Sequence, residues 1–437
     1  MKQKTALDIL KLGHNVFLTG PAGSGKTYLL NQYIEYLKKN NIGVAVTAST
    51  GIAATHMNGQ TIHSWSGMGI ADSISEEEIS KMRKRRYYSE RIRNTKVLII
   101  DEVSMLHPHQ LDMVNAICKG FKDPFSPFGG LQVILCGDFF QLPPVAKYGQ
   151  SSFAMESSAW EEMELKICYL DEQHRQEDGS MLKILNDIRS CSCDQDTIDL
   201  IHTRKNKAIK NVITPTKLFT HNANVDFIND LELKKISEEI KTFVMKDGGN
   251  EHLIATVKKG CLAPEKLGLK KGAVVMFVKN NFERGYVNGT LGKIIGFDDS
   301  DMPIVKTHSG KTIVATPEKW AIEEDEKSLA FVTQIPLRLA WAITVHKSQG
   351  MTLDAVEMDL SKSFEYGMGY VALSRVRTLD GIKLLGINSR ALDVNPKVFE
   401  FDKTLAELSR GNTNYMTKMK ISEKCSLQKD FLEKCKV

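Results

Sequence analysis

The segment GPAGSGKT, residues 20–27, has the residue types and spacing to hold a phosphate group. It follows the apolar run NVFLTG (residues 15–20) and opens a stretch of helical periodicity, Lys26–Lys39. In the pattern G-x-x-x-x-G-K-[ST], backbone N–H groups close around a β-phosphate and the helix N-terminus adds a favourable dipole. The alternative is an ordinary glycine-rich turn. The segment predicts a nucleotide site formed by Gly20, Pro21, Ala22, Gly23, Ser24, Gly25, Lys26, Thr27 and Tyr28.

Two adjacent acids follow a second apolar run, LIIDEVSML (residues 98–106). Parallel sheets bind ligands at the carboxyl ends of their strands, and this run would deliver both acids there. Asp101, together with the Thr27 hydroxyl, would then hold Mg²⁺, and Glu102 would polarise the attacking water. An acid pair after a strand can instead cap a helix. The phosphate-binding segment upstream favours the catalytic interpretation.

A third run, LCGDFFQLPPV (residues 135–145), ends in a polar cluster. Asp138 and Gln141 are candidates to sense the γ-phosphate, and Gln141 is the predicted catalytic residue of the pair. A loop stopped by two prolines is the alternative.

These segments need a sheet to position them, and the apolar runs supply one. Runs that are apolar throughout, rather than alternating, are typical of parallel strands buried on both faces. Such runs are Gly43–Ala48, Lys96–Asp101 and Leu131–Asp138. The pattern resumes at Lys217–Asn222, and further buried-strand candidates are Leu337–Thr344, Ala355–Leu360 and Ile382–Ile387. Helices between them, including 225–235, complete an α/β fold. In Gly272–Thr333, short β-rich pieces separated by turn residues predict a small antiparallel barrel or hairpin array.

Length and composition narrow the class of protein. A chain of 437 residues suggests about two to four domains. The 42% hydrophobic and 25% charged content is that of an average soluble protein, which excludes collagen and wholesale disorder. We expect no membrane helix, signal peptide or disulfide scaffold, because apolar runs are short and eight cysteines are sparse. Cys191 and Cys193 lack zinc-site spacing. A reducing, cytoplasmic compartment is expected.

The net charge of the chain is small, +5 with a pI near 8.6, but basic residues are concentrated in one segment. Lys81–Arg93 (KMRKRRYYSERIR) holds seven basic residues, one acid and two adjacent tyrosines. The run is either a solvated helix face or a patch that contacts nucleic-acid phosphates.

Eight motifs in order carry a resemblance to a known family. Besides GPAGSGKT and DEVSML, they are TASTGIAAT (47–55), GQTIHSW (59–65), PFGGLQVILCGDFFQLPPV (127–145), LDEQHRQ (170–176), AWAITVHKSQGMTLD (340–354) and YVALSRVR (370–377). Together they resemble superfamily-one DNA helicases of the 5′-to-3′ branch. PFGG before GDFFQLPPV, and VHKSQGMTLD, narrow the resemblance to the PIF-type (petite integration frequency) helicases, although RecD-like helicases share several motifs. The resemblance covers residues 1–390.

The resemblance implies roles for single residues. Arg175 and Arg375 correspond to arginines that reach across an interdomain cleft to the γ-phosphate, and Gln349 and Gly350 belong to the same cleft. Gln3 corresponds to the glutamine that reads adenine, with a frayed terminus as the alternative. The DNA-binding side is expected to comprise Thr50, Thr61, His63, Asn222, Thr344, His346 and Lys347. For each of these, a satisfied core polar group is the rival interpretation.

The resemblance also implies an architecture of two RecA-like, parallel-sheet P-loop motor domains. The first would span 1–165, with a small wedge insertion at 66–95 that contains the basic run. The second would span 166–288 and 335–402. An SH3-like β-barrel insertion would occupy 289–334, and 403–437 would form a charged helical tail.

The expected function is an ATP-dependent 5′-to-3′ DNA helicase that uses ATP and Mg²⁺ and acts as a monomer without membrane partners. Single-stranded and forked DNA are the expected substrates, with G-quadruplex and RNA–DNA hybrid left open. The alternatives are a RecD-like helicase, a DNA-stimulated ATPase that serves as a binding scaffold without unwinding, and a ring-forming ATPase whose arginine comes from a neighbour.

Overall fold

The computed structural model describes residues 1–69, 71–144, 152–172, 178–209, 215–219, 225–281, 283–324, 327–345 and 348–436. Four of the predicted site residues, Arg175, Asn222, His346 and Lys347, lie outside these ranges.

The first domain is built on a six-stranded parallel sheet with strand order β3-β2-β4-β5-β1-β6. Its strands are β1 (Val16–Thr19), β2 (Val44–Ala48), β3 (Gln60–Thr61), β4 (Val97–Asp101), β5 (Gln132–Cys136) and β6 (Lys166–Tyr169). Every residue of β1, β4 and β5 is buried, which explains why these runs are apolar throughout. The parallel sheet predicted from the apolar runs is confirmed. Because β6 pairs with β1, this sheet ends at Tyr169 rather than before residue 166.

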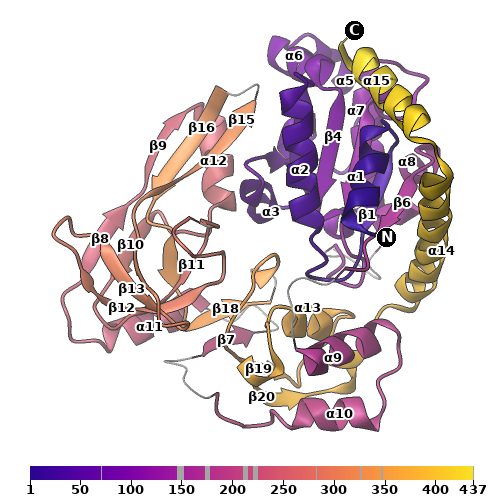
Figure 1. Cartoon of the computed structure of the whole chain (residues 1–437). Helices are drawn as coiled ribbons and strands as arrows, with labels where there is room; N and C mark the ends of the chain where they lie inside the picture. The colour runs from indigo at the N-terminus through magenta and orange to yellow at the C-terminus, as the bar shows by residue number, and fades with distance from the viewer. Residues whose placement is uncertain are drawn as a thin grey trace.

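Helices surround this sheet (Figure 1). They are α1 (Gln3–Lys11), α2 (Lys26–Lys39), α3 (Gly51–His56), α4 (Ile62–Ser66), α5 (Glu76–Arg83), α6 (Arg86–Asn94), α7 (Pro108–Phe121) and α8 (Ser158–Glu162), with short 3₁₀ turns at Val103–Met105, Pro127–Gly130 and Ala154–Glu156. The predicted helix Lys26–Lys39 coincides with α2, whose 3–4 spaced apolar side chains are buried.

The second domain holds a four-stranded parallel sheet of order β18-β7-β19-β20. Its elements are β7 (Thr216–Phe219), β18 (Ala342–Thr344), β19 (Val356–Leu360), β20 (Ile382–Ile387), α9 (Gly179–Arg189), α10 (Gln195–His202), α11 (Val225–Lys234) and α13 (Met368–Ser374), with 3₁₀ turns at Leu379–Gly381 and Ser389–Leu392. The prediction of a single strand over 337–344 is wrong. The backbone changes partners there: Ala340 N donates to Val274 O at 3.0 Å, whereas Trp341 O accepts from Lys217 N at 2.8 Å.

An antiparallel part spans residues 241–339 and lies beside both domains (Figure 1). It contains a five-stranded sheet of order β14-β13-β12-β11-β17, a three-stranded sheet β15-β16-β9 and the pair β10-β8. The elements are β8 (Lys241–Val244), β9 (Lys246–Gly249), α12 (Glu251–Gly260), β10 (Lys266–Leu269), β11 (Val274–Phe277), β12 (Leu291–Phe297), β13 (Pro303–Thr307), β14 (Thr312–Val314), β15 (Glu318–Glu324), β16 (Lys327–Gln334) and β17 (Leu337–Leu339). Antiparallel pairing therefore covers a longer part of the chain than the 289–334 insertion that the resemblance implies.

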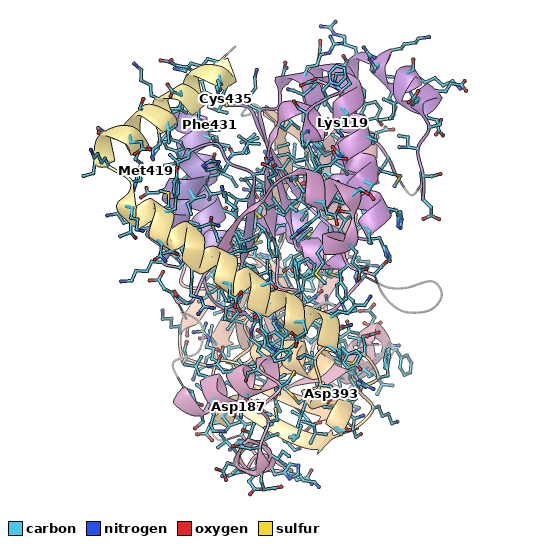
Figure 2. The ribbon with its side chains drawn as sticks, turned by 90° about the vertical axis from the view of Figure 1, so that its right-hand side faces the viewer. Lys119, Asp187, Asp393, Met419, Phe431 and Cys435 are labelled. Carbon is cyan, nitrogen blue, oxygen red and sulfur yellow. The ribbon has the colours of Figure 1, made fainter. Side chains whose placement is uncertain are left out.

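The C-terminal tail consists of α14 (Pro396–Lys418) and α15 (Ile421–Lys436), which connect the second domain to the first (Figures 1 and 2). Asn412 of α14 donates to Ile167 O of β6 at 3.0 Å. Lys424 of α15 forms an ion pair of 2.8 Å with Asp8 of α1. None of the helices in the described ranges is long and apolar enough to cross a membrane.

Candidate functional site: a cleft between the two parallel sheets

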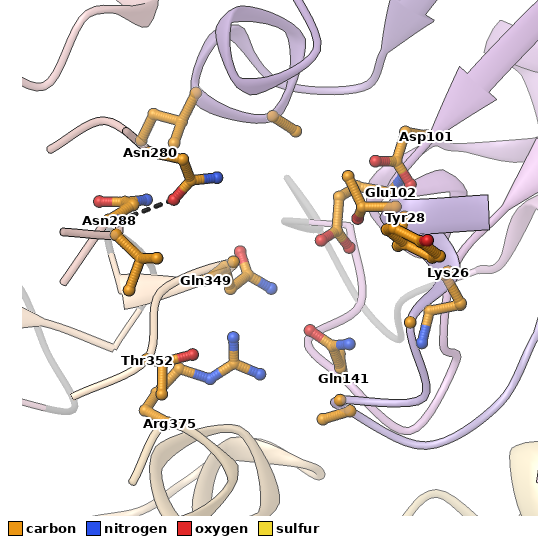
Figure 3. A pocket seen from close by; sticks show the side chains of 18 of the residues that line it. Lys26, Tyr28, Asp101, Glu102, Gln141, Asn280, Asn288, Gln349, Thr352 and Arg375 are labelled. Carbon is orange, nitrogen blue, oxygen red and sulfur yellow. Dashed lines mark hydrogen bonds between the residues drawn. The ribbon is translucent and has the colours of Figure 1, made fainter. Parts of the chain in front are cut away.

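A cavity of about 570 Å³ lies between the two domains and is lined by residues of both. The first domain contributes the phosphate loop, the end of β4 and the loop after β5. The second contributes the segment after β18 and the end of α13, and the β11–β12 loop of the antiparallel part completes the wall. Figure 3 shows Lys26, Tyr28, Asp101, Glu102 and Gln141 facing Asn280, Asn288, Gln349, Thr352 and Arg375.

The phosphate loop is held in its shape by glycine geometry. Gly20 has φ +143, and a Cβ there would lie 2.5 Å from Leu170 O, so no other residue fits without a shift. Lys26 Nζ donates to Gly20 O at 2.8 Å and to Pro21 O at 3.1 Å. The buried Ser24 Oγ has no hydrogen-bond partner among the described residues. An anion in the loop would compete with the Gly20 and Pro21 carbonyls for Lys26.

Asp101 and Glu102 sit at the carboxyl end of β4, as predicted. Asp101 Oδ1 accepts from Glu102 N at 2.9 Å, and burial raises the pKa of Asp101. Glu102 has left-handed backbone angles (φ 51, ψ 44), which are uncommon for a residue other than glycine, and its carbonyl accepts from Ser49 Oγ at 2.7 Å. Burial, reinforced by the Asp101 charge, raises the pKa of Glu102 to about 7. A carboxylate of that pKa suits proton abstraction near neutral pH.

Thr27 and Asp101 both line the cavity and supply one hydroxyl and one carboxylate. Mg²⁺ takes oxygen ligands and usually keeps several waters or substrate phosphates among them. The donor set therefore fits Mg²⁺ held partly by a nucleotide. No cluster of three or more His, Cys, Asp and Glu side chains that would cage a metal occurs within the described ranges.

The two candidates in the loop after β5, Gln141 and Asp138, differ in whether they line the cavity. Gln141 lines the cavity, and its buried Oε1 has no hydrogen-bond partner within the described part of the chain. Asp138 is not among the lining residues; it is 1% exposed and accepts from Arg189 Nη1 at 2.9 Å. The expectation that Asp138 senses the γ-phosphate is corrected by this ion pair, which occupies its carboxylate.

Arg375 and Gln349 form the opposite wall. Arg375 is 1% exposed, and its Nε donates to Val371 O at 3.0 Å while Nη2 donates to Ser374 Oγ at 2.8 Å. Its guanidinium faces the cleft (Figure 3). Burial lowers the pKa of Arg375, and the Glu102 charge opposes that shift. Gln349 Nε2 is buried without a partner among the described residues, and Gly350 lies beside it in the wall.

Gln3 does not line the cavity but lies beside the phosphate loop. Its Nε2 donates to Ser24 O at 3.2 Å, and its backbone N donates to Glu172 Oε2 at 2.9 Å. The preceding Met1 backbone nitrogen donates to Tyr169 O at 2.7 Å. The start of α1 is therefore anchored, which excludes the frayed-terminus alternative.

Of the residues expected on the DNA side, Thr61 and Thr344 lie at the carboxyl edges of the two sheets, whereas Asn222, His346 and Lys347 lie outside the described ranges. Ala48 of β2 is in register with both Thr61 and Asp101, so Thr61 lies at the same edge of the sheet as Asp101. Thr61 Oγ1 caps α4 by accepting from Ser64 N at 3.2 Å. Thr344 ends β18 and is 7% exposed.

Thr50 and His63 lie close to this edge of the first sheet. Thr50 lines the cavity, and its Oγ1 accepts from Ala53 N at 3.3 Å. Burial lowers the pKa of His63 in α4, which favours its neutral form at pH 7. Thr50 and Thr61 therefore already have local capping roles.

Sequence reasoning missed the cleft residues Asn280, Asn288, Thr352 and Arg377. Asn280 Oδ1 accepts from Asn288 N at 2.8 Å, drawn as the dashed line in Figure 3. The two asparagines belong to the β11–β12 loop, for which no motif was available. Arg377 lies two residues after Arg375 in YVALSRVR, so its position was a usable signal.

The basic run divides into parts with different roles. Arg91 is 4% exposed, donates to Trp65 O at 2.8 Å, and lies 3.9 Å over the Tyr87 ring, so it is a structural residue. Lys81 and Arg86 form exposed ion pairs within their own helices. Of the four others, Arg83 ends α5 and is followed by Lys84 and Arg85 in the exposed turn before α6, while Arg93 is exposed near the end of α6.

Comparison with known proteins gives a consistent result. A family model described as PIF1-like helicase matches residues 2–191, and one described as DNA helicase Pif1, 2B domain, matches residues 252–297. A Psychrobacter protein named ATP-dependent DNA helicase Pif1 is 45% identical, over 94% of this chain and 71% of the relative.

Two solved structures extend the comparison. Pif1 from Bacteroides sp in complex with ADP-AlF4 superposes with a TM-score of 0.81 at 31% identity, covering 94% of this chain and 97% of that one. Bacteroides Pif1 bound to ssDNA gives a TM-score of 0.63 at 31% identity and the same coverage.

Proposed function

This chain belongs to the PIF1-like family of ATP-dependent DNA helicases, and from that premise we propose that it moves 5′ to 3′ along single-stranded DNA and unwinds forked duplex. The observation that carries the ATP-driven part of this proposal is the cleft, whereas the 5′-to-3′ polarity rests on the motif resemblance. Phosphate-binding and carboxylate groups occupy one wall, and Arg375 and Gln349 occupy the other, which belongs to a different domain.

The arrangement supports the following division of labour. Thr27 and Asp101 would hold Mg²⁺ against the phosphates, and Lys26 would bind the β- and γ-phosphates. Glu102 would orient and activate the attacking water, with Gln141 beside the γ-phosphate. Arg375, together with Arg175, would neutralise charge that develops in the transition state. Arg375 belongs to the second domain, and the resemblance assigns Arg175 to it as well, so hydrolysis would require a closed cleft.

DNA contacts are proposed at the carboxyl edges of the two sheets. Thr50, Thr61 and His63 on the first domain and Thr344 on the second offer polar groups suited to phosphates and sugars, without reading bases. The resemblance adds Asn222, His346 and Lys347 to this side. The exposed corner formed by Arg83, Lys84 and Arg85 is proposed to contact the duplex junction. A single-stranded track across both domains would favour their closed arrangement and so stimulate ATP turnover.

We propose a functional monomer, because both candidate arginines belong to the same chain as the phosphate loop. In a ring-forming ATPase, a neighbouring subunit would have to supply that charge. Sizing the protein with single-stranded DNA and nucleotide would test this point.

The deciding experiment is unwinding of matched duplexes that carry either a 5′ or a 3′ single-stranded tail, with a Glu102→Gln variant as the inactive control. We expect unwinding of the 5′-tailed substrate alone. Equal unwinding of the 3′-tailed duplex would refute the polarity. DNA-stimulated ATP turnover without any unwinding would favour the scaffold alternative. Substrates with a G-quadruplex or an RNA–DNA hybrid after the 5′ tail extend the same assay.

A further inference from the structure

Arg189 lies at the last position of α9 in the second domain, outside every sequence motif, and is 7% exposed. Its Nη1 donates to both carboxylate oxygens of Asp138 at 2.9 Å and to the Tyr370 hydroxyl at 3.0 Å. Its Nη2 donates to the Tyr169 hydroxyl at 2.8 Å, and Asp402 Oδ1 lies 3.4 Å away. The guanidinium also lies 4.1 Å from the centre of the Phe140 ring.

These partners come from three separate parts of the fold. Asp138 and Phe140 follow β5, and Tyr169 ends β6, so all three belong to the first domain. Tyr370 belongs to α13, which packs beside α9 in the second domain, and Asp402 belongs to α14 of the tail. Figure 1 shows α9 and α13 directly below the first sheet, with α14 passing alongside. One guanidinium therefore joins both domains and the tail.

The same cluster reaches the nucleotide cleft. The Tyr370 hydroxyl donates to Asp138 Oδ2 at 3.2 Å and accepts from the backbone N of Ala22 at 3.2 Å. Ala22 belongs to the phosphate loop and lines the cavity. Arg375 caps the C-terminus of the helix that carries Tyr370. The helix that presents Arg375 to the cleft is thus hydrogen-bonded to the loop that would hold the phosphates.

The cluster is also tightly constrained. Gly367, the N-cap of α13, has φ +77, and a Cβ there would lie 2.4 Å from Phe140 O, so the helix starts directly on the loop after β5. A buried ion pair offsets its desolvation cost only when its geometry and hydrogen bonds are complete. The planar fork of arginine fixes these directions, which a lysine ammonium would not. Separation of α13 from the loop after β5 would break several of these bonds at once.

We propose that Arg189 is a positioning residue for ATP hydrolysis. It holds Asp138 and Tyr370 together across the domain boundary, so that α13, which leads into Arg375, stays joined to the phosphate loop while the cleft closes. This inference rests on the proposed cross-cleft role of Arg375. Arg189 itself does not line the cavity, so it acts through Tyr370 rather than on the nucleotide.

A matched control is available in the same domain. Arg204 is 4% exposed and donates to Asp380 Oδ1 at 2.8 Å, to Asp380 O at 2.9 Å and to Ile382 O at 2.9 Å. All these partners belong to the second domain. If a buried arginine mattered only for stability, Arg204→Met and Arg189→Met would have the same kinetic consequences.

The experiment measures kcat and KM for ATP with saturating single-stranded DNA, per folded molecule, together with melting temperature. We expect Arg189→Met to lower kcat by about tenfold or more and to change KM for ATP by less than about threefold. Arg204→Met should lower the melting temperature and leave kcat within about twofold. Tyr370→Phe, which removes only the hydroxyl, should also lower kcat. Combined with Arg189→Met, it should add little, because both changes break one network.

Wild-type kcat in Arg189→Met, an equal kcat loss in Arg204→Met, or fully multiplicative effects of the Arg189 and Tyr370 changes would overturn the proposal. If Arg189→Met does not fold, Tyr370→Phe decides: wild-type kcat in that variant refutes the network. Arg375→Ala is measured in parallel. Normal turnover in Arg375→Ala would refute the cross-cleft role of Arg375. If Arg375→Ala loses turnover but Arg189→Met keeps it, only the present inference about Arg189 is refuted.

Discussion

The Arg375→Ala substitution removes an arginine that lines the cleft. Among the described arginines of the cleft, Arg375 is the one whose side chain hydrogen-bonds only within its own helix. In the ground state, the substitution deletes the hydrogen bonds that Nε and Nη2 donate to Val371 O and Ser374 Oγ. At about 0.5–1.5 kcal/mol net for each hydrogen bond, they stabilise the fold by about 1–3 kcal/mol. A protein with a typical stability of about 5–15 kcal/mol survives that change. The Arg375→Ala variant should therefore fold.

The effect on turnover should be much larger. An arginine that neutralises the transition state of phosphoryl transfer contributes about 10³–10⁵ in rate, which corresponds to about 4–7 kcal/mol. Arg175 is proposed to share this charge, so we expect kcat to fall by at least about a hundredfold rather than by the full factor. The charge appears only as the bond breaks, so ATP affinity should change by less than about tenfold.

The assay is steady-state ATP turnover with saturating single-stranded DNA, alongside equilibrium binding of ATP and of DNA. Arg377→Ala is the control: Arg377 lines the same cavity, but its Nε is paired with Asp354 Oδ1 at 3.2 Å. We expect this variant to lose less than about tenfold in kcat, because no developing charge is assigned to it. Near-normal DNA-stimulated turnover in Arg375→Ala would refute the cross-cleft assignment and the proposed need for closure.

Three further outcomes are expected. Lys26→Ala should impair nucleotide binding and turnover together, because Lys26 is proposed to bind the phosphates in the ground state as well; isothermal titration with ATP would show whether affinity is instead retained. Replacing Arg83, Lys84 and Arg85 by alanine should either reduce unwinding or flatten the log–log dependence of single-strand affinity on salt concentration. The slope should change by about 0.7 for each phosphate that is no longer neutralised. If both the slope and unwinding are unchanged, these three residues form only a solvated face. Gly13→Ala should detach α15, since Gly13 has φ +83 and its Cβ would lie 2.3 Å from the Phe431 ring; faster proteolytic cleavage between α14 and α15 would reveal this, and unaltered cleavage would count against tight docking of the tail.

Most of the parallel architecture could be predicted from the sequence, because strands buried on both faces leave a simple signal. The runs that become β1, β2, β4 and β5 contain almost no polar residues. That signal does not say where a strand changes partners. The run over 337–344 is mostly apolar, yet it belongs to an antiparallel sheet before Ala340 and to a parallel one after Trp341. The change depends on the positions of Val274 and Lys217, which are distant in sequence.

For the candidate site, local patterns identified the residues but not their orientation. Thr27, Asp101, Glu102, Gln141 and Arg375 all line the cavity, since each belongs to a motif tied to a strand end or a helix end. Asp138 belongs to the same motif as Gln141 but is turned the other way. Its orientation is set by Arg189, a residue in no motif, so pattern reasoning had no means to pair them.

The two walls of the cleft explain why nucleotide binding and domain closure should be one event. Gln141 Oε1 on the first wall and Gln349 Nε2 on the second are buried without partners in the described ranges, and Lys26 is held only by loop carbonyls. Leaving a buried polar group without a partner costs about 1–3 kcal/mol. A triphosphate and its attacking water would offer partners to groups on both walls, but only if the walls approach. The interaction energy of the nucleotide would thus be released largely on closure. DNA that spans the carboxyl edges of both sheets would favour the same closed state, so each ligand should increase the affinity for the other.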